Sequence, residues 1–186
     1  MSEMQLRALP LNGLFSVQHR RHADARGQFS RLFCEGTLGA FGRPFHIRQI
    51  NHSMTAERGS VRGLHYQTAA APEAKIITCV RGAVWDVAVD LNPESATFLQ
   101  WHAERLEAGD RRSLLIPAGF AHGFQALTDD AELLYLHSAD YAQECEAGLS
   151  VNDPLLAIDW PLPVKNLSPR DASHPFLDSS FTGVRV

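Results

Sequence analysis

Turn signals recur along the chain at short intervals, and their spacing limits the fold more than any other feature. Glycine, proline, asparagine and aspartate, which favour tight turns, cluster at 24–27, 81–82, 92–93, 108–110, 117–119 and 128–130. The runs between these turns are short and have strand character. No internal repeat or low-complexity linker interrupts them. This pattern is typical of an all-β sandwich or barrel, and we expect a single domain over residues 1–186.

The clearest strand covers residues 83–91, in which an apolar set alternates with a mixed set. The odd-numbered residues are all apolar and share one face, whereas Asp86 and Asp90 stand on the opposite face with Val84 and Ala88. Such a strand turns one side to the core and the other to a polar cavity or to water. Exposure to solvent is the commoner explanation for two carboxylates at this spacing.

The other expected elements are short. Residues 75–80 precede the clearest strand across the turn at 81–82, so the two are expected to form a hairpin. Further strands are expected at 113–116, 124–127 and 132–137. Helical signal is weak and is confined to 35–41 and part of 141–148. The tail from Pro161 is expected to be extended, with Leu167 and Phe176 holding it across the barrel.

The composition excludes several classes of protein. Apolar residues make up 45% of the chain and charged residues 20%, as in ordinary globular proteins. A formal net charge of −4 argues against general nucleic-acid binding. No apolar run approaches the ~20 residues that span a bilayer, and the start lacks a signal-peptide pattern, so we expect a cytoplasmic protein with no membrane partner. Cys34, Cys79 and Cys145 are expected to be reduced, with Cys79 in the core.

Two segments place a histidine beside a glycine turn. Residues 62–67 contain His65, and residues 116–124 contain His122. A single histidine in an apolar run is more often a hydrogen-bonded core residue than a functional one. Two histidines in such similar settings leave the core and the functional interpretations about equally favoured.

Metal binding is the first alternative role for these histidines, because His65, His122 and a carboxylate could form a facial triad. Metal-binding barrels of this kind usually offer a second histidine two residues after the first and a glutamate shortly after it. Here Gln67 takes the place of that second histidine, and Glu73 is the only nearby carboxylate. We therefore expect no catalytic metal.

Four longer motifs, taken together, resemble the dTDP-4-dehydrorhamnose 3,5-epimerase family. They are Arg-Gly-Leu-His-Tyr-Gln at 62–67, the run 75–90 that ends in Gly-Ala-Val-Trp-Asp-Val-Ala-Val-Asp, Ile-Pro-Ala-Gly-Phe-Ala-His-Gly-Phe at 116–124, and Asn-Asp-Pro at 152–154 with Asp-Trp-Pro at 159–161. Their order and spacing match from Arg26 to Asp171. The resemblance implies a cupin-type jelly-roll β-barrel with short peripheral helices. It also implies an epimerase that acts on a dTDP-linked 4-keto-6-deoxyhexose without a metal or cofactor.

The chemistry of that family assigns roles to four residues. A ketone at C4 acidifies the hydrogens on C3 and C5, so a base can remove a proton and an acid can return one to the opposite face. The resemblance assigns the base to His65 and the carboxylate that orients it to Asp171. It assigns the acid to Tyr135, on the far side of the sugar. Lys75 is the implied cation that stabilises charge on the C4 oxygen.

The resemblance also implies the contacts with the substrate. The residues expected at the nucleotide or diphosphate are Arg26, Gln49, Asn51 and Arg62, since arginine suits forked phosphate binding. Phe29 and Tyr141 are expected to flank the sugar or stack on the base. His122 is expected near the keto oxygen. Two residues depart from the family pattern: Arg31 replaces a usual glutamate, and Val151 replaces a frequent tryptophan.

Quaternary structure and exact activity follow only as expectations. The family is dimeric, with an N-terminal segment that reaches the neighbouring site, so a homodimer is implied. One function is double epimerisation in the dTDP-L-rhamnose pathway, and a close variant is a mono-epimerase at C3 or C5 in another deoxysugar pathway. A non-catalytic sugar-nucleotide-binding barrel is the alternative outside catalysis. The combination of His65, Asp171 and Tyr135 favours an enzyme, because binding alone would not require it.

Overall fold

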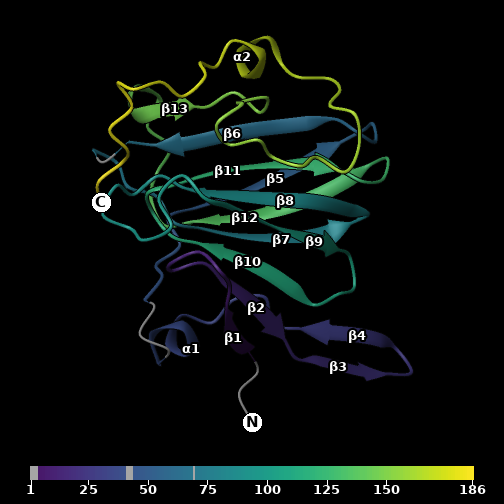
Figure 1. The fold of residues 1–186 in the computed structure, drawn as a ribbon. Coiled ribbons are helices and arrows are strands. Elements are labelled where there is room, and N and C mark those ends of the chain that lie inside the picture. The colour runs from purple at the N-terminus through teal and green to yellow at the C-terminus, as the bar shows by residue number, and fades with distance from the viewer. Residues whose placement is uncertain (1–3, 41–43, 69) are drawn as a thin grey trace.

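Two antiparallel sheets form the body of the molecule (Figure 1). The structure is a computed structural model that describes residues 4–40, 44–68 and 70–186. The six-stranded sheet has the order β1 (Met4–Ala8), β2 (Phe15–His19), β10 (Arg112–Ile116), β7 (Lys75–Arg81), β12 (Ala131–His137) and β5 (Gln49–Thr55). The five-stranded sheet has the order β13 (Glu146–Gly148), β6 (Val61–Gln67), β11 (Phe120–Ala126), β8 (Ala83–Asp90) and β9 (Trp101–Glu107).

The remaining elements are small and lie at the periphery. A separate hairpin of β3 (Arg21–Asp24) and β4 (Gly27–Ser30) projects from the body beside β2 (Figure 1). The helices are α1 (Glu35–Ala40), the 3-10 turn η1 (Gln143–Cys145) and α2 (Pro169–Ala172). The all-β architecture with short peripheral helices is therefore confirmed, whereas the single domain over 1–186 stays a prediction. Among the described residues, no helix is long and apolar enough to cross a membrane.

An apolar core between the two sheets holds them together. Ile77 and Leu114 from the six-stranded sheet are buried against Val84, Ala88 and Phe124 from the five-stranded sheet. Burying one leucine or phenylalanine side chain is worth about 1.5–3 kcal/mol. Packing of this layer therefore sets how the two sheets, and the side chains that they carry, face each other.

Two further clusters cover the outer faces of the sheets. Leu149 and Leu177 of the C-terminal segment pack with Val87 of β8, and this segment runs over the five-stranded sheet in Figure 1. On the other side, Leu38 of α1 packs with Ile76 of β7. The C-terminal segment, including α2, is thus fixed over one end of the molecule by apolar contacts.

The polar face of β8 is buried, so solvent exposure is the wrong explanation for its carboxylates. The side chains of Asp86 and Asp90 are both 0% exposed. Asp86 faces His122, and Asp90 accepts a hydrogen bond from the Thr97 hydroxyl at 2.6 Å. The reason is that β8 is a central strand with a core on both sides. Asp86 does not line the polar cavity itself and reaches it only through its bond to His122, which does.

The predicted hairpin of β7 and β8 is wrong. β7 pairs with β10 and β12, whereas β8 pairs with β11 and β9 in the other sheet. Gly82, at φ +68°, lets the chain cross between the sheets, and a Cβ there would overlap the Thr128 hydroxyl. A glycine turn between two strands therefore marks a change of sheet here.

Most other predicted elements are confirmed with altered bounds. Strands at 113–116 and 132–137 correspond to β10 and β12, and the strand at 124–127 begins earlier, at Phe120. The predicted helix 35–41 corresponds to α1, although residue 41 lies outside the described residues. Within 141–148 only η1 is helical, and β13 follows it.

The predictions for the tail and the cysteines are confirmed except at two points. Beyond residue 161 the chain is extended apart from α2, which was not expected. Leu167 packs on the C-terminal cluster as predicted, but Phe176 is 58% exposed and the neighbouring Leu177 is buried in its place. Cys79 is in the core, and all three cysteines are free.

Candidate active site

A cavity of about 930 Å³ lies between the two sheets. Strands β5, β7 and β12 of one sheet line it together with β6 and β11 of the other, and α2 contributes at its edge. Its size is in the usual range for small-molecule sites. Nine of the eleven predicted residues line it: His65, Asp171, Tyr135, Lys75, Gln49, Asn51, Arg62, His122 and Tyr141.

A β-bulge in β6 turns two of these residues toward the cavity. Arg62 and His65 are three residues apart, so a regular strand would place them on opposite faces. They pair with Phe124 and His122 of β11, which are only two residues apart, and the extra residue in β6 forms the bulge. Gly63, at φ +125°, permits this shape. The glycine beside His65 thus makes a bulge within a strand and not the turn expected from the sequence.

His65 and Asp171 form a hydrogen-bonded pair, with Nε2 of His65 2.7 Å from Oδ1 of Asp171. Asp171 is brought here by α2, whose N-cap Ser168 accepts a hydrogen bond from the Asp171 amide at 3.0 Å. The Gly63 amide donates to the other carboxylate oxygen at 3.4 Å. Burial alone would raise the pKa of the Asp171 carboxyl, but His65 and this amide outweigh burial and hold its pKa below the usual value. Asp171 is therefore a carboxylate at neutral pH.

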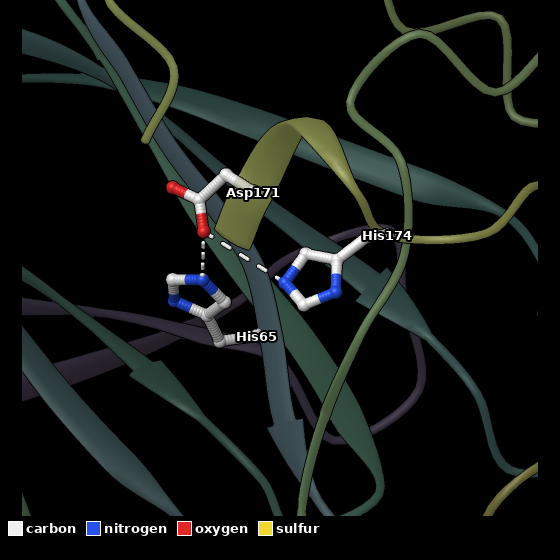
Figure 2. Close-up of side chains that lie close together, drawn as sticks. All are labelled: His65, Asp171 and His174. Carbon is white, nitrogen blue, oxygen red and sulfur yellow. Dashed lines mark hydrogen bonds and ion pairs between the residues drawn. The ribbon is translucent and has the colours of Figure 1, made fainter. Parts of the chain in front are cut away.

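His174 is a third member of this group and was missed in the sequence. Its Nε2 lies 3.7 Å from the same Asp171 oxygen, and Figure 2 shows both imidazoles turned toward the carboxylate. Burial, then the charge of His65, lowers the pKa of His174. The ligand-type atoms of His65, Asp171 and His174 lie within 4.8 Å of one another, the one group among the described residues with metal-site spacing.

Tyr135 faces the cavity from β12, in the sheet opposite to that of His65. Its hydroxyl is 3.2 Å from the Ser53 hydroxyl of β5. Its ring stacks on His137 at 5.9 Å with an interplanar angle of 13°, and meets His122 edge-on at 6.2 Å. Burial raises the pKa of the Tyr135 phenol. Tyr135 is therefore protonated at neutral pH and can donate a proton or a hydrogen bond.

Lys75 belongs to a buried network that includes two residues not singled out as catalytic in the sequence. Its ammonium is 3.0 Å from Glu73, whose other oxygen accepts from Nδ1 of His137 at 2.7 Å. Asn51 completes the chain at 3.3 Å from Nε2 of His137. Burial would raise the pKa of the Glu73 carboxyl, but His137 and Lys75 hold it below the usual value. Glu73, the candidate metal carboxylate, is thus occupied by a lysine and a histidine.

His122 is buried beside the proposed base. The register of β11 on β6 sets it opposite His65, and its Nε2 lies 3.0 Å from both oxygens of Asp86. The His122 side chain is 6% exposed and that of Asp86 0%. This pair places a hydrogen-bonded imidazole in the cavity wall. The only sequence signal for Asp86 is the alternation of residues in β8.

The other cavity residues form a polar rim. Gln49 donates to Asn51 at 3.1 Å and accepts from the Tyr141 amide at 3.1 Å. The Tyr141 hydroxyl donates to Glu146 at 2.6 Å. The Arg62 guanidinium is held by Thr55 and by a backbone carbonyl of β5. These groups offer amide, phenol and guanidinium contacts at the cavity mouth.

Arg26 and Phe29 are the two predicted residues that do not reach this cavity. Both lie on the projecting hairpin of β3 and β4 (Figure 1). The Arg26 side chain is 90% exposed and pairs with Asp24, and Phe29 is 61% exposed. Within one chain the structure does not bring them to the other site residues. Of the two departures from the family pattern, Val151 is buried in the C-terminal cluster.

Facing antiparallel sheets around a side-chain-lined cavity define a cupin-type jelly-roll protein, with the site between the sheets. Within that class the chain belongs to the dTDP-4-dehydrorhamnose 3,5-epimerase family, whose model matches residues 8–179. The protein is therefore an isomerase. The predicted family and fold are confirmed.

Individual relatives include both double and single epimerases. The chain is 42% identical to the dTDP-4-dehydrorhamnose 3-epimerase of Streptomyces niveus, over 90% of this chain and 81% of the relative. It is 39% identical to a dTDP-4-dehydrorhamnose 3,5-epimerase of Mycobacterium tuberculosis, over 98% and 90%. The structure of the Legionella pneumophila dTDP-6-deoxy-D-glucose-3,5-epimerase in complex with dTDP-4-keto-L-rhamnose superposes with a TM-score of 0.91 at 34% identity, covering 98% of each chain.

Proposed function

We propose that this protein epimerises C3 and C5 of dTDP-4-dehydro-6-deoxy-D-glucose, the step that leads to dTDP-L-rhamnose. One observation carries the proposal: a histidine–carboxylate pair and a buried, protonated tyrosine face the same cavity from opposite sheets. Inversion at carbon needs a base on one side of the sugar ring and an acid on the other. His65 on β6 and Tyr135 on β12 satisfy that requirement.

His65 acts as the base in this mechanism. Because Nε2 donates its hydrogen to Asp171, Nδ1 carries the lone pair that accepts a proton from C3 or C5. The Asp171 carboxylate stabilises the imidazolium that results and fixes the tautomer, as in a hydrolase triad. The ketone at C4 accepts the electron pair as an enolate, so the step needs no cofactor. Tyr135 then returns a proton to the opposite face.

Lys75 and His122 stabilise the enolate oxygen. Lys75 is buried, and its ammonium is held in place by Glu73 before substrate arrives. A fixed cation in a site shielded from water stabilises developing negative charge without rearrangement, which is often the largest catalytic effect. His122 lies opposite His65 in the strand register and adds a second polar group on that side.

The nucleotide and diphosphate are bound by residues from two chains in this proposal. Gln49, Asn51, Arg62 and Tyr141 contribute from the rim of the cavity. Arg26 and Phe29 lie exposed on the projecting hairpin, which supports a homodimer in which this hairpin covers the partner's cavity. Arg26 then supplies a diphosphate contact and Phe29 a stacking surface. Arg26→Ala should weaken substrate binding in a dimer without changing the fold.

A C3 mono-epimerase is the second candidate, favoured by the 42% identity to the Streptomyces niveus 3-epimerase. It would use the same base, acid and cation. We also propose that the enzyme acts in the cytoplasm. The three free cysteines support that location, since disulfides are rare in reducing compartments.

Proton exchange in deuterated water tests the proposal. With dTDP-4-dehydro-6-deoxy-D-glucose, deuterium at both C3 and C5 is the expected result, and deuterium at C3 alone would assign the mono-epimerase. His65→Ala should abolish both exchanges. Tyr135→Phe should retain exchange at C3 while forming little inverted product. Full activity in His65→Ala would reject the mechanism, and no exchange by the wild-type protein would reject the function.

A further inference from the structure

His174 presents an unused nitrogen to the proposed catalytic pair. Its Nε2 is shielded from solvent and has no hydrogen-bond partner within the described part of the chain. It lies 3.7 Å from the Asp171 oxygen that His65 contacts at 2.7 Å. A buried polar atom without a partner is unfavourable and calls for an explanation, such as an ion that is bound in part of the working cycle.

The position of this ring is built into the sheet. Gly148 of β13 is the register partner of His65 in β6, and a Cβ on Gly148 would overlap the His174 imidazole. Glycine at this position leaves room for the ring. His174 therefore packs edge-on against His65, with ring centroids 5.6 Å apart and planes at 75°. As Figure 2 shows, three ligand-type side chains converge on one point.

We propose that Nε2 of His65, Oδ1 of Asp171 and Nε2 of His174 form a binding site for Zn²⁺, and that zinc bound there switches the enzyme off. Two imidazole nitrogens, one carboxylate oxygen and an open fourth position are a donor set that Zn²⁺ favours. Tetrahedral zinc with bonds of about 2.0–2.1 Å holds its ligand atoms about 3.3 Å apart. The observed separations in the two contacts with Asp171, 2.7 and 3.7 Å, bracket that spacing, and all three atoms lie within 4.8 Å of one another.

The inhibition follows from the tautomer of His65, and this part rests on the proposed function. In the metal-free enzyme the hydrogen of neutral His65 is on Nε2 and the lone pair is on Nδ1. Zinc on Nε2 takes that position, so the hydrogen must move to Nδ1. Nδ1 then has no lone pair with which to remove a proton from the sugar. Bound zinc also takes Asp171 away from its role beside the imidazolium.

Equilibrium dialysis of the full-length protein against zinc chloride, after treatment with EDTA, tests the site without reference to activity. The variant His174→Phe keeps a ring above Gly148 and removes the nitrogen, and His174→Gln is a second variant should the first fold poorly. His102→Phe is the matched control, because His102 pairs with Glu104 on β9 away from the cavity. Mg²⁺, which does not favour imidazole, serves as the control ion.

We expect one zinc per wild-type chain, affinity at least ~10-fold weaker in the His174 variants, and wild-type affinity in His102→Phe. Zinc should stop deuterium exchange by the wild type, and EDTA should restore it. Relative to its own rate without zinc, each His174 variant should lose a smaller fraction of exchange at the same zinc concentration. Equal zinc affinity in wild type and both His174 variants, or no stoichiometric binding, would overturn the site. Binding without loss of exchange would overturn the inhibition. A metal-free protein that exchanges no proton rejects the proposed function, while dialysis still decides the site.

Discussion

Replacing Asp171 by asparagine removes the charge beside the proposed base and keeps the shape. The carboxylate is 5% exposed and 2.7 Å from His65. For charge centres about 4–5 Å apart at an effective dielectric constant of about 20, the attraction is about 3–4 kcal/mol. The His65 side chain is 32% exposed, so solvent screening leaves about 2–3 kcal/mol. Since this stabilisation acts on the imidazolium that forms during the reaction, kcat should fall about 30–160-fold.

The assay is the initial rate of deuterium incorporation at C3, measured by NMR at neutral pH with saturating substrate. Asp130→Asn is the matched control, because Asp130 forms an exposed ion pair with Arg81 away from the cavity, and its kcat should equal that of the wild type. A folded Asp171→Asn protein with kcat within about threefold of wild type would refute the role given to the carboxylate, because that ratio corresponds to less than ~1 kcal/mol.

Three further predictions concern stability. Glu73→Gln leaves Lys75 buried without its counterion, so the free energy of unfolding in urea should fall by about 3–5 kcal/mol; an unchanged urea midpoint would contradict the network. Folding lowers the pKa values of the Glu73 and Asp171 carboxyls. The stability that these carboxylates contribute is therefore present above their unfolded pKa of about 4, and it is lost as the pH falls through their lower folded pKa values. The urea midpoint should therefore drop on acidification below about pH 4, less steeply in Glu73→Gln, and equal slopes would count against this origin. Gly123→Ala places a Cβ 2.8 Å from a carbonyl oxygen of the bulge and should cost about 1–3 kcal/mol, whereas Gly36→Ala, with open space around it, should not destabilise the protein.

The sequence predicts which residues of a strand share a face, but it does not predict which strands pair with each other. Side chains alternate along any strand, so the pattern in β8 identifies its two faces whatever lies beside it. Gly82 could not show where the chain goes next, because a hairpin turn and a crossing between sheets both use a glycine at positive φ. The choice depends on contacts with distant strands. The same limit applies to Asp90, which is buried because a loop folds back and Thr97 binds it.

The sequence predicted those site residues whose side chains have a recognisable chemical function of their own. Nine such residues line the cavity, and their individual roles stay predictions. Glu73, His137 and His174 were missed as parts of the site because only a contact with another residue gives each of them a role. Glu73 contacts Lys75, His137 contacts Glu73, and His174 contacts Asp171. His137 follows Tyr135 by two residues on one strand, a usable signal. His174 depends on α2 lying over β6, which no local pattern indicates.

The proposed base and the proposed acid stand on different sheets, and this gives the apolar core a second role. His65 and Tyr135 are attached to different sheets, and the layer containing Ile77, Leu114 and Phe124 keeps those sheets apart. Facing sheets pack about 10 Å apart, a separation determined by the side chains between them. The core therefore sets the distance between the proposed base and the proposed acid. A change of side-chain volume in this layer, which also packs against Tyr135, would therefore shift the two proposed groups relative to each other.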